Sequence, residues 1–585
     1  MPREETSISV VRGSRAKNIL TALNSSSPFS RWVIRAGSRT FREKYDDGLI
    51  PPRQNRVGAP ISSMKIVTSQ QMRHIEERAQ QAGVETNALM ENAGLAVAER
   101  VRHHLGAVDG IPVIVLVGPG NNGGDGLVMA RHLHDWGGRA TAYLCHLRRE
   151  DDPNLAILRE KGVNILDATR DEAFAELREA LRSARIAVDA VLGTGRSRPI
   201  DGLLRNVLHE LATAKERRPE LSIMALDLPT GLDADTGAVD PVCPTADETV
   251  ALGYPKVGLY KFPGAEHAGH IEVVDIGVPP GLDGDVRLEL MTSTFAGATL
   301  PARPLSAHKG TFGRTLVVAG SASYVGAAYL ASAAAARSGA GLVTLAIPRS
   351  LQMAVAAKAA EPTYIPLPES SPGVPSDDAH TPILENMPRY DSLLVGCGMG
   401  QAPVTQGMLK RLLFSEAPLP PTVVDADGLN FLAGYQDPGW WNQMRPRAIV
   451  TPHPGEMARL TSDTIDSVET DRVGISIESA VKWDKVVVLK GAHTVVAFPS
   501  GQAMLSPFVN PGMATAGTGD VLAGIIAGLL AQGLSLEDAA ALGVYLHGLA
   551  GERLRDTQGE TGMLASDLLA ALPQAIKELA LEAKG

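Results

Sequence analysis

The stretch IPVIVLVGPGNNGGDGLVMARHLHDWG, residues 111–137, indicates how the first part of this chain folds. It opens with a continuous apolar run rich in β-branched side chains, which is typical of a strand buried on both faces of a parallel sheet. A glycine-rich turn follows, and the apolar spacing after it predicts a helix. Gly118, Gly120 and Gly123 match the G-x-G-x-x-G pattern of a dinucleotide-binding turn, where backbone approaches a pyrophosphate at a helix N-terminus.

The same alternation of strand and helix continues on both sides of this stretch. Further predicted strands are ATAYLCHL, IAVDAVLG and LSIMALDLP, separated by amphipathic helical patterns. Residues 64–280 are therefore expected to form one doubly wound, Rossmann-like α/β domain. A proline-bracketed polar stretch, residues 281–304, is interpreted as a connection. A second alternating series starts with RTLVVAG at residue 314 and predicts a larger α/β domain over residues 305–585.

The composition of the chain excludes several classes of function. It is 44% hydrophobic and 21% charged, which is typical of a soluble globular protein, and its net charge of -10 does not favour binding to nucleic acid or to an anionic membrane. The apolar stretch VLAGIIAGLLAQGL, residues 521–534, is shorter than the roughly 20 residues of a membrane span. We therefore expect small-molecule ligands, and 585 residues are enough for more than one active site.

Cysteine usage and the first residues suggest where the protein works. Cys145, Cys243 and Cys397 are far apart and lack the spacing of a disulfide framework or a zinc site, so we expect a cytoplasmic protein. We also expect the chain to form a homo-oligomer.

Residues 1–63 are rich in Ser and Arg but more acidic than a typical transit peptide. We interpret them as a disordered extension or as the result of a start assigned too early, with Met64 as the functional start.

Polar side chains follow several predicted strands of the first domain. The glycine-rich turn carries two asparagines and Asp125, Asp189 precedes a second turn, and Asp227 and Thr230 lie in a third. Because ligands of parallel sheets bind at the carboxyl ends of strands, we expect these groups to converge, and their oxygens suit a hard cation. The alternative is that Asp189 and Asp227 only cap turns. The acid that would hold a ribose in a Rossmann fold is missing, because Arg148 and Arg149 come first in CHLRRE.

Four segments of the first domain together carry a resemblance to a known family. LMENAG (89–94), GPGNNGGDG (118–126), VDAVLGTG (188–195) and DLPTG (227–231) resemble the NAD(P)H-hydrate epimerases. The resemblance implies a potassium ion held by Asn122, Asp189 and Thr230. It also implies that the hydrated dinucleotide contacts Asn121, Asn122, Gly123, Gly124, Asp125, Gly193, Thr194, Gly195, Arg196, Ser197, Arg198, Pro199 and Asp227. Inverting carbon 6 of the hydrate needs proton transfer to and from oxygen, for which Asp189 and Asp227 are both candidates.

The segment NPGMATAGTGDVLAGIIAGLLAQG, residues 510–533, predicts the site of the second domain. Small residues before a long apolar helix place several backbone N–H groups around one point, which is an anion-binding arrangement. Asp520 can there accept a proton from a hydroxyl while the backbone holds the phosphoryl group under attack. The alternative is that Asp520 is only a helix N-cap, although a cap does not need such a run of small residues.

The second domain also resembles a known family. Its GTGD sequence is similar to the ribokinase-like superfamily, and four further segments narrow the resemblance to the ADP-dependent NAD(P)H-hydrate dehydratases. These are HKGTFGRTLVVAGSASYVGAAYLASAAAARSGAGLV (308–343), VDADGLNFL (424–432), TPHPGEMARL (451–460) and VLKGAHTVV (488–496). One departure is GCGMG at 396–400, where the family often has Gly-Pro-Gly.

This resemblance implies roles for individual residues. Asp520 would be the base, Gly519 would contact the nucleotide, and the hydrate would face Ala327, Gly398, His453 and Asp520. The alternative for His453 is that it only holds its own Pro-Gly turn. The ADP site would be lined by Lys490, Gly491, Ala492, His493 and Thr494.

The implied reaction moves a phosphoryl group from ADP to the hydroxyl of the S hydrate, and elimination of phosphate restores NADH or NADPH. Magnesium is expected to bridge the donor phosphates, although the sequence shows no clear set of magnesium ligands. Two other functions remain open: a vitamin or sugar kinase fused to a nucleotide-binding module, and a first domain that binds a partner without catalysis. We favour repair of hydrated NADH and NADPH, because the two independent sets of motifs imply the same substrate.

Overall fold

The computed structural model describes residues 63–146, 148, 151–194, 199–435 and 439–582. Apart from Ser63, the extension expected before Met64 lies outside the described residues. No described helix combines the length and the apolar character needed to cross a membrane.

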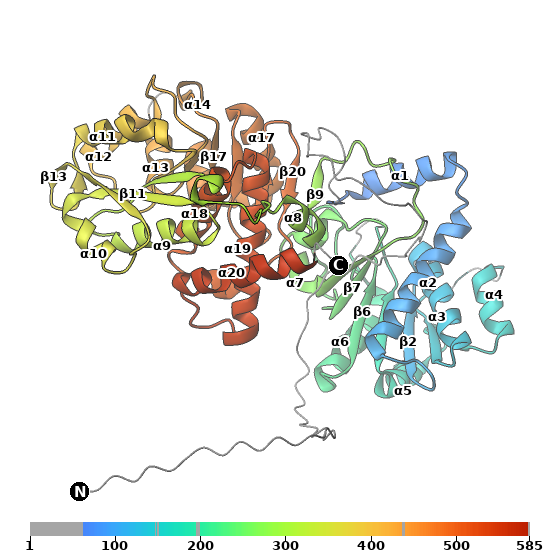
Figure 1. The fold of residues 1–585 in the computed structure, drawn as a ribbon. Coiled ribbons are helices and arrows are strands. Elements are labelled where there is room, and N and C mark those ends of the chain that lie inside the picture. The colour runs from blue at the N-terminus through green and yellow to red at the C-terminus, as the bar shows by residue number, and fades with distance from the viewer. Residues whose placement is uncertain (1–62, 147, 149–150, 195–198, 436–438, 583–585) are drawn as a thin grey trace, which may run out of the picture. The chain divides into compact units, whose positions relative to one another are not determined.

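The first domain is built on a sheet of seven parallel strands (Figure 1). In spatial order these are β4 (Asn164–Asp167), β3 (Arg139–Leu144), β2 (Pro112–Val117), β5 (Ile186–Ala190), β6 (Ser222–Leu226), β7 (Glu248–Leu252) and β8 (His270–Val274). The chain runs outward from β2 to β4 and then returns to place β5 beside β2. This reversal creates a crevice at the carboxyl ends of β2 and β5, where open α/β sheets bind their ligands.

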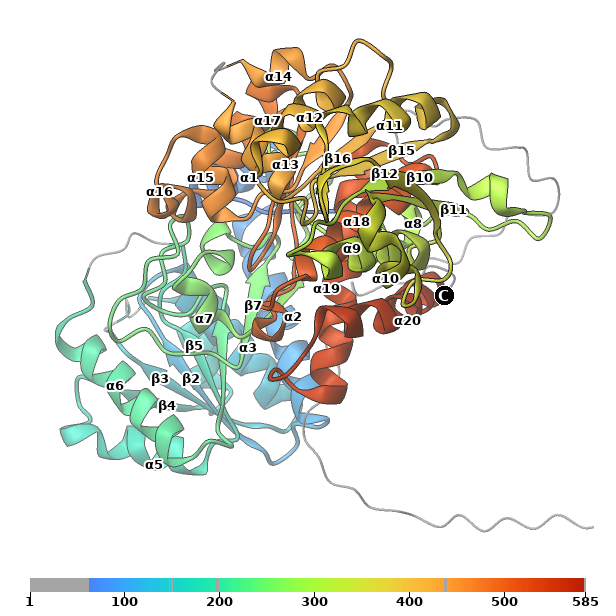
Figure 2. The ribbon, with the colours of Figure 1, turned by 90° about the vertical axis from the view of Figure 1, so that its left-hand side faces the viewer.

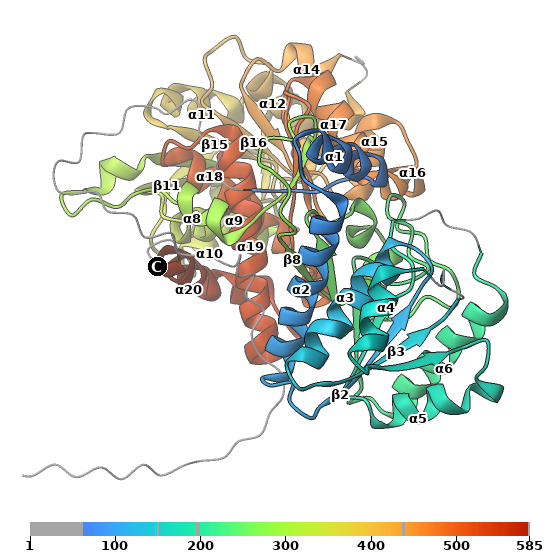
Figure 3. The same ribbon diagram turned by 90° about the vertical axis from the view of Figure 1, so that its right-hand side faces the viewer.

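Helices cover both faces of this sheet, as the doubly wound prediction requires (Figures 1 and 3). One face carries α1 (Ser69–Gln81), α2 (Thr86–Leu105), α3 (Asn121–Asp135) and α4 (Pro153–Glu160), and the other carries α5 (Ala175–Ser183) and α6 (Gly202–Arg217). The short α7 (Gly264–Ala268) precedes β8. Val115 of β2 packs into the first of these cores and its neighbour Leu116 packs into the second. A strand with apolar residues at consecutive positions is stable only when both faces are covered, which explains the continuous run in the sequence.

The second domain is built on a sheet of eleven strands. In spatial order these are β1 (Met64–Lys65), β9 (Leu288–Leu290), β20 (Ala503–Leu505), β19 (Val495–Ala497), β18 (Val486–Leu489), β17 (Ala448–Val450), β16 (Thr422–Val424), β15 (Ser392–Val395), β10 (Arg314–Val318), β11 (Leu342–Pro348) and β12 (Thr363–Leu367). The strands from β18 to β12 are parallel, and β19 pairs antiparallel with both of its neighbours. The short strands β13 (Glu369–Ser371) and β14 (Val374–Pro375) form a separate hairpin.

Two segments outside the predicted second domain join the edge of its sheet. Met64 of β1 pairs with Leu290 of β9, and β9 pairs in parallel with β20. The stretch 281–304, expected to be a connection, therefore contains a strand and also the helix α8 (Ser293–Thr299).

Two groups of helices cover the faces of the second sheet (Figure 2). One face carries α8, α9 (Val325–Arg337), α10 (Gln352–Ala356), α18 (Thr518–Ala531), α19 (Leu536–Gln558) and α20 (Ala565–Glu582). The other carries α11 (His380–Asn386), α12 (Pro403–Leu413), α13 (Asp427–Gly434), α14 (Trp440–Gln443), α15 (Pro454–Thr461), α16 (Ile465–Thr470) and α17 (Arg472–Trp483). A Cβ on Gly524 would lie 2.3 Å from the carbonyl oxygen of Ala331, so the glycines of α18 allow it to approach α9 closely.

Candidate active sites

The glycine-rich turn of the first domain begins a helix, and its glycines serve different purposes. Gly120 is the N-cap of α3, so Asn121–Asp125 are the first five residues of that helix. A Cβ on Gly118 would lie 1.9 Å from the carbonyl oxygen of Val191, and one on Gly123 would lie 2.1 Å from that of Gly118. Those two glycines are required by protein packing, whereas a Cβ on Gly120 would meet no atom of the described residues within 4 Å. Gly120 is therefore the glycine of the fingerprint that leaves room for a ligand.

Arg148 occupies the position at the end of the second strand where a Rossmann fold has its ribose acid. Its Nη1 donates hydrogen bonds to the carbonyl oxygens of Gly118 (2.5 Å) and Gly120 (3.2 Å), and its Nη2 lies 2.6 Å from Asp152 Oδ2. The guanidinium group of Arg148 thus fixes the backbone of the glycine-rich turn through its carbonyl oxygens. The neighbouring Arg149 lies outside the described residues.

A buried group of oxygen atoms lies at the end of β5. Asp189 is fully buried, and it accepts hydrogen bonds from the backbone nitrogen of Thr230 (2.7 Å), from the Thr230 hydroxyl (2.6 Å) and from the backbone nitrogen of Val191 (3.3 Å). Burial raises the pKa of Asp189, and the hydrogen bonds from Thr230 oppose that shift. A Cβ on Gly193, in the turn after β5, would lie 3.2 Å from Asn122 Oδ1. The structure thus brings together the three residues expected to hold a cation.

Asn122 has an amide group that the protein does not satisfy. Its Nδ2 atom is buried and has no hydrogen-bond partner among the residues that the structure describes. Oxygen and nitrogen of an asparagine amide are assigned from their hydrogen bonds, so the same position can hold the amide oxygen. Buried polar atoms are nearly always paired, and an orphan at this point indicates a missing ligand.

A second buried group at the ends of β6 and β7 contains a residue that the sequence analysis did not select. Lys256 is 1% exposed, and its Nζ donates hydrogen bonds to Asp227 Oδ1 and to the carbonyl oxygen of Leu252 (3.2 Å). Asp227 has a left-handed backbone, with φ of 68°, which is uncommon for a residue other than glycine. Lys256 follows β7 in the segment ALGYPKVGL, so the rule that ligands bind at strand ends could have found it.

Two further carboxyl groups lie near this ion pair. Burial, together with the charge of Asp227, raises the pKa of Asp125 to about 8. Burial also raises the pKa of Glu76, although the charge of Lys256 opposes the shift. At neutral pH Asp125 is therefore mostly protonated and can donate a hydrogen bond.

The predicted second turn is only partly described. Gly193 and Thr194 are half-buried and Pro199 is exposed, whereas Gly195, Arg196, Ser197 and Arg198 lie outside the described residues.

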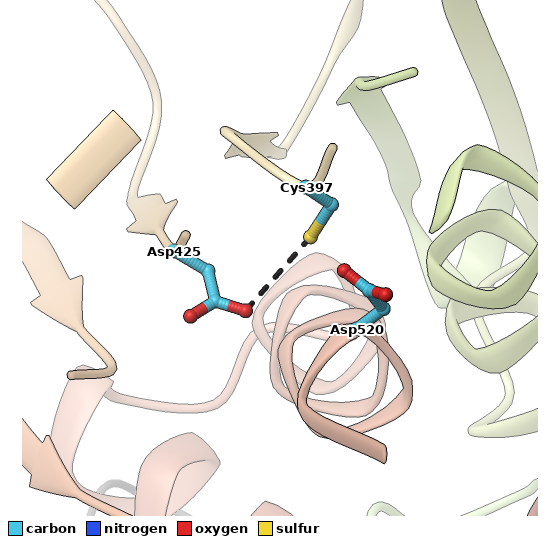
Figure 4. A group of neighbouring side chains, drawn as sticks. All are labelled: Cys397, Asp425 and Asp520. Carbon is cyan, nitrogen blue, oxygen red and sulfur yellow. Dashed lines mark hydrogen bonds between the residues drawn. The ribbon is translucent and has the colours of Figure 1, made fainter. Parts of the chain in front are cut away.

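In the second domain, Asp520 lies in the first turn of α18, next to two side chains from the ends of other strands (Figure 4). Cys397 follows β15, Asp425 follows β16, and one ligand atom from each of these three residues lies within 4.8 Å of the others. The Cys397 sulfur is 3.9 Å from Asp425 Oδ2. Burial, together with the charge of Asp425, raises the pKa of Asp520 to about 6. Asp520 therefore remains largely ionised at neutral pH, although it is a stronger base than an exposed aspartate.

Lys490 lies close to Asp520 and contacts two other acidic residues. Its Nζ lies 2.6 Å from Asp425 Oδ1 and 3.8 Å from Glu456 Oε2. Burial lowers the pKa of Lys490, but the two carboxylates outweigh this effect and raise it, so the lysine stays charged. Burial raises the pKa of Glu456 to about 7. A Cβ on Gly519 would lie 3.3 Å from Lys490 Nζ, so the predicted nucleotide residues Lys490 and Gly519 are neighbours of Asp520.

The turn after Lys490 is held by its own side chains. Thr494 Oγ1 accepts a hydrogen bond from the Gly491 nitrogen (3.3 Å) and donates one to the Gly491 oxygen (2.9 Å). His493 points into the protein, with Nδ1 3.0 Å from the Ser506 oxygen, and burial lowers its pKa to about 4. The exposed parts of this turn that can meet a ligand are Gly491 and Ala492.

Besides Asp520, the three other residues expected to face the hydrate have different surroundings. A Cβ on Gly398, whose φ is 60°, would lie 2.7 Å from the Cβ of Ala327, so these two residues touch. His453 is the N-cap of α15, and its Nδ1 accepts hydrogen bonds from the nitrogens of Gly455 (3.0 Å) and Glu456 (3.3 Å). The histidine therefore does hold its own Pro-Gly turn, and the ring nitrogen left to meet a ligand is Nε2, which lies 3.6 Å from Glu456 Oε1.

Asp425 and Glu456 lie in segments that carried the family resemblance, but neither was predicted to be a site residue. Each is nearly fully buried, and each contacts Lys490. A polar residue directly after a buried strand, as in VVDAD, was the signal that could have identified Asp425.

Comparisons with known proteins agree with the two-site arrangement. A family model described as YjeF-related protein N-terminus matches residues 86–258, and one described as NAD(P)H-hydrate dehydratase matches residues 315–574. The chain is 41% identical over 524 residues to the bifunctional NAD(P)H-hydrate repair enzyme Nnr of Moorella thermoacetica, covering 88% of this chain and 97% of that protein. It is 37% identical to the enzyme of the same name from Thermofilum pendens, with the same coverage. A crystal structure of the ADP/ATP-dependent NAD(P)H-hydrate dehydratase from Bacillus subtilis is 31% identical and covers 50% of this chain and 98% of that chain, with a TM-score of 0.43.

Removing Lys256 should destabilise the first domain strongly, because Asp227 would be left as an unpaired buried charge. We expect Lys256→Met to lower the free energy of unfolding by about 3–5 kcal/mol, measured by urea denaturation. The double variant Lys256→Met/Asp227→Asn should regain part of that loss, because asparagine carries no charge and tolerates the left-handed backbone of this position. Arg182→Met breaks an exposed ion pair with Glu179 and should leave the urea midpoint unchanged. An equal loss of stability in Lys256→Met and Arg182→Met would contradict the importance of burial.

Proposed function

We propose roles for the residues of both sites in a chain that belongs to the family of bifunctional NAD(P)H-hydrate repair enzymes. The first domain epimerises the R and S hydrates of NADH and NADPH, and the second dehydrates the S hydrate with consumption of ADP. The observation that supports these roles most directly is the position of Asp520. It lies in the first turn of α18 beside the charged Lys490, where a hydroxyl and a phosphate can meet.

The epimerase site suits a potassium ion. A buried carboxylate, a buried hydroxyl and an unsatisfied buried amide form an all-oxygen donor set at Asp189, Thr230 and Asn122. When bound, the ion would supply a fixed positive charge beside the dinucleotide. The residues Asn121, Asn122, Gly123, Gly124, Asp125, Gly193, Thr194 and Asp227 remain our candidates for contact with the hydrate.

We assign proton transfer in the epimerase to Asp227. Asp189 is less suitable, because it is fully buried and both of its oxygens already accept hydrogen bonds from Thr230. Lys256 acts as a positioning residue, since its ammonium group donates a hydrogen bond to one oxygen of Asp227 and holds it in place. The protonated carboxyl of Asp125 can donate a hydrogen bond to the hydroxyl of the substrate, as other neutral carboxyl groups do in apolar sites.

In the dehydratase, Asp520 accepts the proton of the substrate hydroxyl as that oxygen attacks the terminal phosphorus of ADP. The bond from this phosphorus to AMP breaks, and Lys490 neutralises charge on the transferred group. Loss of phosphate from carbon 6 and of a proton from the neighbouring ring carbon to solvent then restores the double bond of NADH or NADPH. Gly519 and the turn Lys490–Thr494 are assigned to ADP, and Ala327, Gly398 and His453 to the hydrate.

Magnesium and the cellular setting are further parts of the proposal. The group formed by Cys397, Asp425 and Asp520 includes sulfur, which magnesium avoids, so we propose that magnesium arrives bound to the phosphates of ADP. We keep the expectation of a cytoplasmic homo-oligomer, and the three free cysteines support a reducing compartment.

The role of Asp520 can be tested with a mixture of R and S hydrate and ADP, followed by the absorbance of NADH. The wild type should recover all of the NADH. Asp520→Asn should lower the dehydration rate by about 10²–10⁴-fold, because the hydroxyl loses its base. Epimerisation of isolated R hydrate, followed by chromatography, serves as the control and should continue. Recovery at the wild-type rate would contradict the assignment.

The two aspartates of the first site should differ in their response to potassium. Asp227→Asn and Asp189→Asn should both leave the R hydrate unconverted at low potassium. High potassium should restore activity only in Asp189→Asn, since that variant has lost a cation ligand and keeps its proton-transfer group. Restoration of Asp227→Asn by potassium would reverse the two assignments.

The dehydratase should lose activity in acid. Protonated Asp520 cannot accept a proton, so kcat/KM should fall as the pH is lowered through about 6, the pKa of this carboxyl. The measurement is initial NADH formation from purified S hydrate across pH 5–8, with stability checked at each pH. A profile that falls only near pH 4 would show that the base is an ordinary exposed carboxylate.

A further inference from the structure

Cys397 is a buried thiol held in a defined position between two carboxylates (Figure 4). It lies between Gly396 and Gly398, which both have left-handed backbones, with φ of 125° and 60°. A Cβ on Gly396 would lie 1.9 Å from the carbonyl oxygen of Asp425, so the turn packs tightly against the end of β16. The Cys397 oxygen accepts a hydrogen bond of 2.9 Å from the Gly320 nitrogen. The sulfur therefore has little freedom to turn away from the carboxylates.

The distances within this group are close to those of a metal site. The three ligand atoms lie within 4.8 Å of one another, and the sulfur is 3.9 Å from Asp425 Oδ2. A tetrahedral zinc ion with one sulfur and two oxygen ligands needs these atoms about 3.5 Å apart, given bond lengths near 2.3 and 2.0 Å. Side-chain rotations that close the group by about 1 Å would be enough.

The charges around the group also suit a divalent cation. Lys490 donates a hydrogen bond to Asp425 Oδ1, so the other oxygen of Asp425, Oδ2, is the one that faces the Cys397 thiol. Two carboxylates and a thiolate carry three negative charges. Lys490 carries one positive charge and shares it with Glu456, so the group keeps at least two negative charges, which suits a divalent ion. Asp520 is only partly buried and gives the ion a path from solvent.

We propose that Cys397, Asp425 and Asp520 form a site for a thiophilic divalent cation such as Zn²⁺, with water as the fourth ligand. Binding forms a bond from metal to sulfur, and the thiol proton passes to solvent together with water from the metal ion. Sulfur favours zinc, cobalt or cadmium over the magnesium that accompanies ADP. Because the ion occupies a carboxylate oxygen of Asp520, it inhibits dehydration and leaves epimerisation intact. Only this inhibition depends on the role of Asp520 proposed above.

The test uses Co²⁺ as a spectroscopic probe of the full-length protein. Cobalt bound to a thiolate gives a charge-transfer band in the near ultraviolet, and we expect this band to saturate at one Co²⁺ per chain. Zn²⁺ should displace the cobalt with loss of the band, and a large excess of Mg²⁺ should not. Cys397→Ser should bind cobalt without the band, whereas Cys243→Ser, which removes a buried thiol of the first domain, should keep it.

Several results would overturn the metal site. These are no band in the wild type, a band that persists in Cys397→Ser, or a band that is lost in Cys243→Ser. Circular dichroism checks that both variants fold, and the zinc and magnesium competition in the wild type tests the site without any variant. A cobalt band together with undiminished dehydration at saturating Zn²⁺ would support the metal site and would overturn the role of Asp520 as the base.

Discussion

In a parallel sheet every strand points the same way, and both sites of this protein depend on that constraint. The carboxyl ends of the strands, and the turns that follow them, must meet along one edge of the sheet. Asp189 lies near the end of β5, Asp227 and Lys256 follow the neighbouring strands β6 and β7, and Cys397, Asp425 and Lys490 follow parallel strands of the second sheet. Residues far apart in the chain are thus brought together by backbone direction alone, and side-chain chemistry then decides what each edge binds.

The two sites use the same electrostatic arrangement although their sheets differ. In each, a buried lysine pairs with an aspartate at a strand end: Lys256 with Asp227, and Lys490 with Asp425. A further carboxyl group near the N-terminus of a helix lies close to each pair, and its pKa is raised by burial and by the paired aspartate. The raised pKa keeps the carboxyl group of Asp125 mostly protonated at neutral pH, where it can donate a hydrogen bond, and makes Asp520 a stronger base than an exposed aspartate.

Glycine illustrates how far a motif can be interpreted before the structure is known. The G-x-G-x-x-G pattern correctly indicated a strand followed by a helix. Gly118 and Gly123, however, are required by contacts between backbone segments, and Gly120 alone leaves open space. His453 shows a similar limit, because the same Nδ1 atom that could meet a substrate caps a helix. Local sequence states which conformations and hydrogen bonds are possible, and the neighbouring segments determine which of them form.

Apolar periodicity and local turn chemistry were enough to predict the alternation of buried strands and amphipathic helices, the two α/β domains and the motifs at the strand ends. The pairing by which Met64–Lys65 and Leu288–Leu290 complete the second sheet emerged from the folded chain, since strand pairing joins residues that no local pattern connects. The folded chain also pairs Lys256 with Asp227 and places Cys397 between two carboxylates. The physical reason is that burial and charge pairing depend on which side chains meet in space, and spacing along the chain does not encode this.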